Sequence, residues 1–443
     1  MLLNQLNNVV IKILVPILVK INSIFFLALL FRLNLRKINF INPKQKTKYK
    51  LIVLGKLGGN EDLYRSQKEN NKHVAYYYFP RIFIKMIFNS FIQNHKEIND
   101  YKYLTNDKNV NVSKLKLRKF LIKLLKNIKK NFNFDGFIGF NFCYKAEREL
   151  QAAATIVKLK FICLHKENVS TPGENLVTKH IYKKHLGKYE GYTIAVYSEK
   201  EKKDILDAKL IDKKRIKVVG CARSDIAFSF RKIVPYYKIV YYSIDNARGT
   251  PERFFKIYPN KFKNIFNFSG KKFSNFSWEE IHKKTIKNLV KLANKDKKLK
   301  IIIKEKQGTI HNYKDLKLPS NCKIIFGGTG EKFLKDCKVV IGLNTTAILE
   351  AIAANRYIQI PFYKYKNDNY KKNFLLNLRL NQNNYIFEES EFYKKVKFHL
   401  SKKYKVNKNN NNQFSLNYYL GNVDGKSSKR LNEFIANSLK SKI

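Results

Sequence analysis

Short apolar runs alternate with amphipathic helical segments along most of this chain. The first series of runs occupies residues 49–54, 73–79, 135–142, 160–165, 192–197 and 215–220. A second series follows Pro235, at residues 239–244, 299–304, 323–326, 339–342 and 357–360. Strands that are apolar throughout and separated by helices are typical of parallel sheets that are buried on both faces. The alternation therefore predicts an α/β fold with two doubly wound, Rossmann-like parallel sheets.

The length of 443 residues is enough for two or three domains of about 100–200 residues each. We expect a basic apolar segment, two α/β domains and a final helix, at residues 1–37, 45–230, 236–420 and 425–443. Open parallel sheets bind ligands at the carboxyl ends of their strands. The two domains are therefore expected to face a cleft.

The strongest feature of the composition is a formal net charge of +54, from 88 Lys and Arg against 34 Asp and Glu. Most of the basic residues are Lys, and they are spread along the whole chain. Proteins that read bases favour Arg and concentrate their charge in one motif or tail. We therefore expect no specific nucleic-acid partner, although a basic protein that binds nucleic acid or another anionic polymer remains an alternative.

Cysteine and histidine give no sign of a metal centre. The five cysteines contain no Cys-x-x-Cys pair, and the eight histidines show no ligand spacing. Most of the cysteines lie in apolar runs, which is typical of buried free thiols in a reducing compartment. We expect no metal and no cofactor.

The N-terminal segment raises the question of a membrane. Residues 9–31 are strongly apolar, but the longest uncharged piece, residues 21–31, is too short to cross about 30 Å of hydrocarbon. The cations within and after it are Lys12, Lys20, Arg32, Arg36 and Lys37. Three interpretations remain open: an interfacial helix or weak signal anchor, a helix packed on the first domain, or a true span.

A second amphipathic helix is predicted at residues 113–130, with an apolar stripe between faces that carry Lys. It fits an anionic bilayer surface, or it packs its stripe on the sheet and leaves Lys in water.

The segment at residues 338–363 has the most informative pattern. A buried strand ends at Gly342, and the turn Asn344-Thr345-Thr346 opens a helix. Asn or Thr caps such a helix, and its free N–H groups attract an anion. Glu350 lies one turn further on, where a carboxylate suits the two hydroxyls of a ribose. The alternative is an ordinary β-α unit with a capping residue and a surface Glu.

This segment resembles the nucleotide-binding unit of GT-B glycosyltransferases, and more narrowly that of the CDP-glycerol glycerophosphotransferase and capsule-polysaccharide transferase group. Those families have a strand, a Ser/Thr-rich turn, a helix with a Glu and a strand that ends in Pro. Here these features are Ile341-Gly342, the turn at residues 344–346, Glu350 and Ile360-Pro361.

The resemblance implies further donor-binding residues. Lys304 ends a strand, as does a phosphate-binding Lys of these families, but the His-Pro that often follows it there is replaced by Glu305-Lys306. Ser243 and Arg248 lie where the glycerophosphotransferases place a Thr and an Arg near phosphate. Alternatively, Arg248 is an arginine of a long surface loop. Gly328, within residues 327–330, would let the backbone approach a base.

On the acceptor side, His165 and Glu167 follow a buried strand and are candidate bases for an acceptor hydroxyl. Alternatively, they are a loop histidine and a surface glutamate. A weaker candidate cluster is Asn60, Glu61 and Asp62, after Gly58-Gly59 in a loop predicted at residues 55–62.

We therefore expect a metal-independent glycosyltransferase or polyol-phosphate transferase of cell-envelope polysaccharide or lipid-linked glycan biosynthesis. Its donor would be a nucleotide-sugar or nucleotide-polyol, and its acceptor a glycan or lipid-linked group. It would be cytoplasmic and peripheral to the inner membrane, on an anionic surface. A nucleotide-sugar epimerase of the UDP-N-acetylglucosamine 2-epimerase type is the enzymatic alternative.

Overall fold

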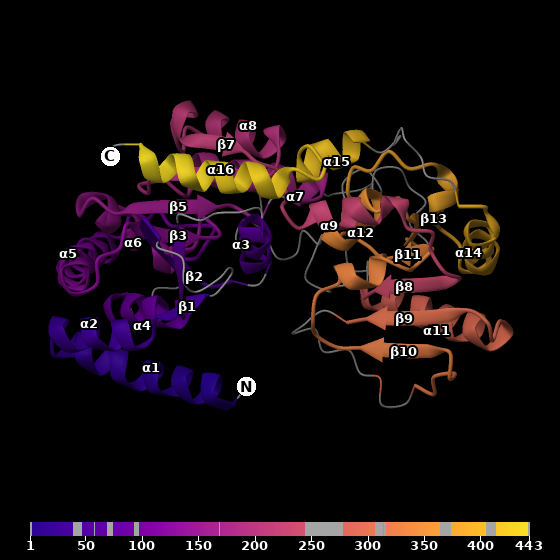
Figure 1. Ribbon diagram of the computed structural model, residues 1–443, viewed down its shortest axis with the longest axis horizontal. Helices are drawn as coiled ribbons and strands as arrows, with labels where there is room; N and C mark the ends of the chain where they lie inside the picture. Colours follow the sequence, from indigo (N-terminus) through magenta and orange to yellow (C-terminus); the bar gives the residue numbers. More distant parts are fainter. Residues whose placement is uncertain are drawn as a thin grey trace. The chain divides into compact units, whose positions relative to one another are not determined.

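The computed structural model describes residues 2–38, 47–56, 58–68, 74–92, 97–167, 169–243, 278–305, 313, 316–363, 374–404 and 413–441. The chain forms two compact units. The first comprises Met1–Asn168, Lys179–Arg223 and Lys426–Ile443, and the second comprises Val169–Thr178 and Ser224–Gly425. Each unit is built on its own sheet (Figure 1).

The first unit contains a sheet with the strand order β1-β3-β2-β4-β5-β6-β7. Its strands are β1 (Arg36–Ile38), β2 (Tyr49–Leu54), β3 (Val74–Phe79), β4 (Gly136–Gly139), β5 (Lys160–Leu164), β6 (Thr193–Val196) and β7 (Ile216–Val218). All neighbours pair in parallel except β1, which pairs antiparallel with β3. The edge strand β1 was not predicted, because only three residues of mixed polarity form it.

Helices before, between and after these strands complete the first unit. They are α1 (Leu2–Lys20), α2 (Ile24–Leu33), α3 (Gly59–Lys68), α4 (Arg81–Phe91), α5 (Lys108–Asn131), α6 (Lys145–Ile156), α8 (Glu199–Asp207) and α16 (Ser427–Lys440), while α7 (Pro172–Lys184) belongs partly to each unit. The loop predicted at residues 55–62 is wrong in its second half, since α3 already begins at Gly59.

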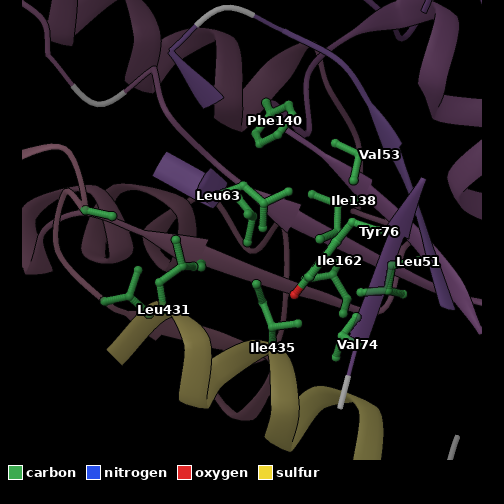
Figure 2. Packing of buried hydrophobic residues seen from close by; sticks show 14 of the residues in the cluster. Leu51, Val53, Leu63, Val74, Tyr76, Ile138, Phe140, Ile162, Leu431 and Ile435 are labelled. Atoms are coloured by element: carbon green, nitrogen blue, oxygen red, sulfur yellow. The ribbon is translucent and has the colours of Figure 1, made fainter. Parts of the chain in front are cut away.

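One face of the first sheet is covered by the last helix of the chain. Leu431, Ile435 and Leu439 of α16 join the apolar cluster formed by β2, β3, β4, β5 and α3. Figure 2 shows Leu431 and Ile435 pointing from this helix toward the side chains of the strands. Because the strands are also covered on their other face, apolar residues occupy nearly every position along them.

Helix α5 carries the basic amphipathic pattern seen in the sequence. Its apolar stripe is buried against α2 and α6, and exposed Lys residues occupy the outer face. The alternative that this stripe lies on a bilayer is therefore wrong, because packing within the first unit already covers it. Asp107 caps the helix, and its Oδ1 accepts hydrogen bonds from the N–H groups of Asn109 at 2.8 Å and Val110 at 3.2 Å.

The N-terminal helices α1 and α2 form a hairpin that packs on α4 and α5. Their inner sides are buried through Ile11, Val15, Leu27 and Phe31. Their outer sides expose large apolar residues, namely Leu6, Val9, Val10, Ile13, Leu14, Ile17, Ile21, Phe25, Phe26, Leu29 and Leu33. No helix in the described ranges combines the length and hydropathy needed to cross a bilayer.

The second unit contains a fully parallel sheet with the order β10-β9-β8-β11-β12-β13. Its strands are β8 (Lys238–Tyr242), β9 (Lys300–Lys304), β10 (Cys322–Ile325), β11 (Val339–Ile341), β12 (Tyr357–Pro361) and β13 (Tyr385–Ile386). Its described α-helices include α9 (Ser224–Ser229), α11 (Trp278–Lys295), α12 (Thr346–Ala353), α14 (Phe392–Ser401) and α15 (Gln413–Leu420). The predicted α/β fold with two doubly wound parallel sheets is confirmed.

Candidate functional site

The second sheet reverses its winding direction between β8 and β11. From β8 the chain adds β9 and β10 on one side, and it then returns to place β11 on the other side. The ends of the two strands are close, since a Cβ added at Gly342 would lie 3.5 Å from the carbonyl oxygen of Tyr242. Ligands of open α/β sheets bind at such a point. The residues that follow β8, β9 and β11 therefore form the candidate donor site.

Helix α12 begins directly after this point. Thr345 is its N-cap, and its Oγ1 accepts a hydrogen bond at 3.4 Å from the backbone N–H of Ala347. Thr346 is the first helical residue. The N–H groups of the first turn and the helix dipole favour negative charge at this end. The start of α12 is thus suited to an anionic group bound at the switch point.

Asn344 fixes the turn before this helix. Its φ of +45° lies in the left-handed region that Asn tolerates. Its Nδ2 donates to the carbonyl oxygen of Phe374 at 2.6 Å, and its Oδ1 accepts from the N–H of Leu376 at 3.1 Å. The side chain therefore ties the segment at residues 374–376 to the turn.

Glu350 is buried one turn into α12, among apolar residues of the same helix. It is close enough to Tyr242 to affect that side chain. Burial raises the pKa of Tyr242 well above its usual value, and the negative charge of Glu350 adds to this rise. Glu350 is thus located near the carboxyl end of β8.

The glycine turn after β10 leaves room beside the backbone. Gly327 and Gly328 have φ values of +64° and +72°, which glycine adopts without strain. A Cβ built on either would meet no described atom within 4 Å. Arg248, also expected at the donor, lies outside the described residues.

Lys304 and Ser243 come together at the ends of β9 and β8. The Lys304 side chain is 5% exposed, and its Nζ donates to the carbonyl oxygen of Glu305 at 2.7 Å. Burial is the main cause that lowers the pKa of Lys304. Ser243 donates from Oγ to Glu305 Oε2 at 3.0 Å. Glu305 thus links the two predicted residues through its backbone carbonyl oxygen and its carboxylate.

Glu305 belongs to a buried network that the sequence did not reveal. Tyr313 donates to its Oε1 and also contacts Nε2 of His282 at 3.2 Å. The other ring nitrogen of His282, Nδ1, lies 2.8 Å from the Tyr241 hydroxyl. These side chains come from β8, α11 and the chain after β9, so no local motif marks them. The network holds Ser243 and the end of β9 in place.

In the first unit, His165 lies at the carboxyl end of β5 but is only 1% exposed. Its Nε2 is 3.5 Å from both Glu201 Oε1 and the Tyr182 hydroxyl, which itself donates to Glu201 at 2.9 Å. Burial opposes ionisation of Glu201, but hydrogen bonds from His165 and Tyr182 and the nearby Lys200 outweigh it and lower its pKa. This carboxylate orients the His165 imidazole.

Glu167 is more accessible, with its side chain 40% exposed and 3.5 Å from Lys166. The weaker cluster at residues 60–62 lies in the first turn of α3. Its Asp62 is buried, accepts hydrogen bonds from the Tyr197 hydroxyl and the backbone N–H of Arg223, and pairs with the Arg223 guanidinium at 3.2 Å. Asp62 therefore joins α3 to the chain that follows β7.

The first sheet has its own switch point, between β2 and β4. Lys56 follows β2, Arg81 opens α4 after β3, and Tyr144 and Glu147 lie where β4 leads into α6. Arg81 forms an ion pair with Glu147, which is 1% exposed, and stacks on the ring of Tyr144. Burial raises the pKa of Glu147 to about 7 despite the opposing effect of Arg81. Sequence patterns did not single out these four residues.

The His, Cys, Asp and Glu side chains of the described residues do not gather into a metal site. No group of three or more His, Cys, Asp and Glu side chains there is arranged to hold a metal ion. All five cysteines are buried free thiols.

No protein-family model matches the chain, and no curated protein matches its sequence. Solved structures do resemble it. One is the wall teichoic acid polymerase TagF, with 12% identity and a TM-score of 0.46 over 99% of this chain and 98% of that chain. Another is MnaA of S. aureus with UDP, with 9% identity and a TM-score of 0.45 over 90% of this chain and 99% of that chain.

A third similar structure is a UDP-N-acetylglucosamine 2-epimerase from Rickettsia bellii. It has 10% identity and a TM-score of 0.43, over 89% of this chain and 97% of that chain.

Proposed function

We propose that this protein is a transferase that binds a nucleotide-activated sugar or polyol phosphate through its second unit. One observation carries the proposal. The start of α12, Glu350, Ser243 and Lys304 gather around the switch point between β8 and β11. The helix start and Lys304 suit the phosphates of the donor, and Glu350 suits the hydroxyls of its ribose.

The reaction would be a displacement at the donor. An acceptor hydroxyl attacks the anomeric carbon of a sugar, or the phosphorus of a polyol phosphate, and forms the new bond to oxygen. The bond to the nucleotide breaks, and the nucleotide leaves as a diphosphate or a monophosphate respectively. A base in the first unit takes the acceptor proton, and His165 and Glu167 remain our candidates. The proposal requires neither a metal nor a cofactor.

We propose further that the protein works at the cytoplasmic face of the inner membrane, on a glycan or lipid-linked acceptor. The support is the outer side of the α1–α2 hairpin, where Ile13 is 56% and Phe25 63% exposed. Exposed apolar surface of this extent marks an interaction site. The exposed cations Lys12, Lys20 and Arg32 on the same helices fit anionic lipid headgroups.

Donor binding is tested by titrating the protein with UDP and CDP. Replacing Lys304 by Ala should weaken binding about tenfold or more, because a buried charge-assisted contact to phosphate is lost. Replacing Glu350 by Ala should weaken nucleotide binding but have less effect on binding of inorganic pyrophosphate, which has no ribose.

Lys300→Ala is the matched control, because Lys300 is exposed at the opposite end of the same strand. It should bind both nucleotides as the wild type does. If Lys304→Ala and Glu350→Ala also leave nucleotide binding unchanged, the donor site is assigned wrongly. A 2-epimerase would convert a UDP-sugar without any acceptor, so product analysis in its absence separates the two activities.

A further inference from the structure

A group of basic side chains surrounds the switch point of the first sheet. Lys56 comes from the end of β2, and Arg81 and Lys85 come from the first two turns of α4, which follows β3. Tyr144 immediately precedes α6, which follows β4. These residues therefore share the sheet edge at which α/β proteins bind ligands.

The Tyr144 ring is the common contact of two of these cations. The Arg81 guanidinium lies 3.5 Å from the ring centroid, and Lys56 Nζ lies 5.7 Å from it. Stacking on an aromatic face holds a guanidinium in a fixed orientation. Glu147 restrains Arg81 further through its ion pair. Arg81 is thus held in place on two sides.

Acidic groups only partly offset this positive charge. Glu147 is already engaged by Arg81, and Asp100 accepts a hydrogen bond from the backbone N–H of Lys145 at 2.8 Å. Within the described part of the chain, neither Lys56 nor Lys85 forms an ion pair within 4 Å. Burial lowers the pKa of Lys85, repulsion from Arg81 and Lys56 lowers it further, and attraction to Asp100 and Glu147 only partly opposes this.

Two other cations near Lys56, namely Lys166 and Arg223, differ in that each is paired with an acidic side chain. Lys166 Nζ and Arg223 Nη1 both lie within 4 Å of a Cβ built on Gly58 in the loop after β2. Each has an acidic partner, since Lys166 pairs with Glu167 at 3.5 Å and Arg223 with Asp62 at 3.2 Å. The cations without an acidic partner are therefore Lys56 and Lys85, on either side of Arg81, which is paired with Glu147. An anion bound among the three would relieve their repulsion.

We propose that Lys56, Arg81 and Lys85 form an anion subsite that binds a phosphate or phosphodiester group of the acceptor, with Glu147 as a positioning residue for Arg81. This rests on the proposed transferase function, since it assigns the acceptor to the first unit. A guanidinium flanked by two ammonium groups suits the several oxygens of a phosphate. Two acceptors combine such a phosphate group with a free hydroxyl: a polyol-phosphate chain, and a glycan linked to a lipid diphosphate.

The test measures binding of inorganic pyrophosphate to the full chain at about 0.15 M salt, with UDP present to occupy the donor site. The double variant Lys56→Ala/Lys85→Ala should weaken pyrophosphate binding about tenfold or more. The matched control is Lys116→Ala/Lys123→Ala, which removes the same charge from exposed positions on α5. It should bind pyrophosphate as the wild type does.

The subsite is disproved if the Lys56/Lys85 variant binds pyrophosphate normally, or if the α5 variant loses as much affinity. UDP affinity is measured on the same variants and should not change. An unchanged UDP affinity with normal pyrophosphate binding rejects the subsite alone, whereas no UDP binding by the wild type rejects the donor site.

Two further arms identify the source of the phosphate. Competition by glycerophosphoglycerol supports a polyol-phosphate acceptor, and competition by geranyl diphosphate supports a lipid diphosphate. Competition by neither overturns the assignment to an acceptor. With an acceptor of the competing class that carries a free hydroxyl, Glu147→Gln should raise the KM for that acceptor with little change in kcat, because it loosens Arg81 without removing it. A fall in kcat as large as the rise in KM would contradict a positioning role for Glu147.

Discussion

At the scale of single residues, the Glu147 carboxyl is the most strongly perturbed acid near the first switch point. Burial raises its pKa to about 7 from an ordinary value of 4.5. The folded protein therefore holds this proton more tightly than the unfolded chain does. The stability contributed by protonated Glu147 is present below about pH 4.5 and is lost as the pH rises through about 7.

Replacing Glu147 by Gln should remove this dependence on pH. The wild-type free energy of unfolding should fall between about pH 5 and pH 8, with a contribution from Glu147 on the order of 3 kcal/mol. The variant keeps a neutral group that still accepts a hydrogen bond from Arg81, so its fall should be smaller. Urea unfolding at several pH values measures both, and parallel profiles would show that Glu147 does not titrate in this way.

Site residues whose role depends on the residues next to them in the sequence could be predicted. The Thr345 cap follows from a polar residue placed between a strand and a helix. Lys304 was expected from the resemblance to transferase families in which a Lys ends the corresponding strand, and it does end β9. The contact of Glu305 with Ser243 and the pair of Arg81 with Glu147 could not be predicted. Each joins side chains about sixty or more positions apart, and one sequence does not show which strands lie side by side.

At the scale of elements, the α1–α2 hairpin and α5 both combine apolar residues with cations but differ in packing. Both have an apolar stripe and Lys residues, yet α5 buries its stripe and the hairpin is apolar on its outer side as well. An amphipathic stripe fits either a sheet or a bilayer, so the sequence left both open. Only the position of neighbouring helices decides between them.

The outer side of the hairpin should therefore be needed for membrane binding. Ile13→Glu/Phe25→Glu should reduce sedimentation with vesicles of phosphatidylcholine and phosphatidylglycerol about tenfold or more, because each Glu brings charge into an apolar contact and repels anionic lipid. Leu115→Glu changes a similarly exposed apolar residue on α5 and should bind like the wild type. Equal binding by all three proteins would rule out the hairpin as the contact.

Short elements were the least predictable part of the fold. Strands β1 and β13 have three and two residues, too few for a pattern of their own. Each is the edge strand of a sheet whose other strands pair with one another. Helix α3 was hidden by the glycines at its start, because Gly58-Gly59 is more typical of a turn.

At the scale of the whole molecule, the chain ends in the unit in which it began. Helix α16 follows the second unit, yet its apolar side chains complete the core beneath the first sheet (Figure 2). The final helix and its apolar face were predictable from periodicity. The large positive charge says less about the site. Among the described residues, most Lys side chains are exposed, and only a few basic residues gather at the two switch points.

Ile435 tests the role of this last helix. It is fully buried, so Ile435→Ala should lower the free energy of unfolding of the first unit by about 2–5 kcal/mol. Lys429→Ala, on the exposed side of the same helix, should change it by less than about 0.5 kcal/mol. Hydrogen exchange of β2 to β5 reports on this unit separately. Unchanged exchange in Ile435→Ala would mean that α16 is dispensable there.

We propose that a nucleotide-activated donor binds at the switch point of the second sheet. A crystal structure of the protein with UDP or CDP would show where the nucleotide lies. We expect a diphosphate at the start of α12 within reach of Lys304, and a ribose against Glu350. A nucleotide bound between β2 and β4 of the first sheet, or away from the strand ends of both sheets, would contradict it.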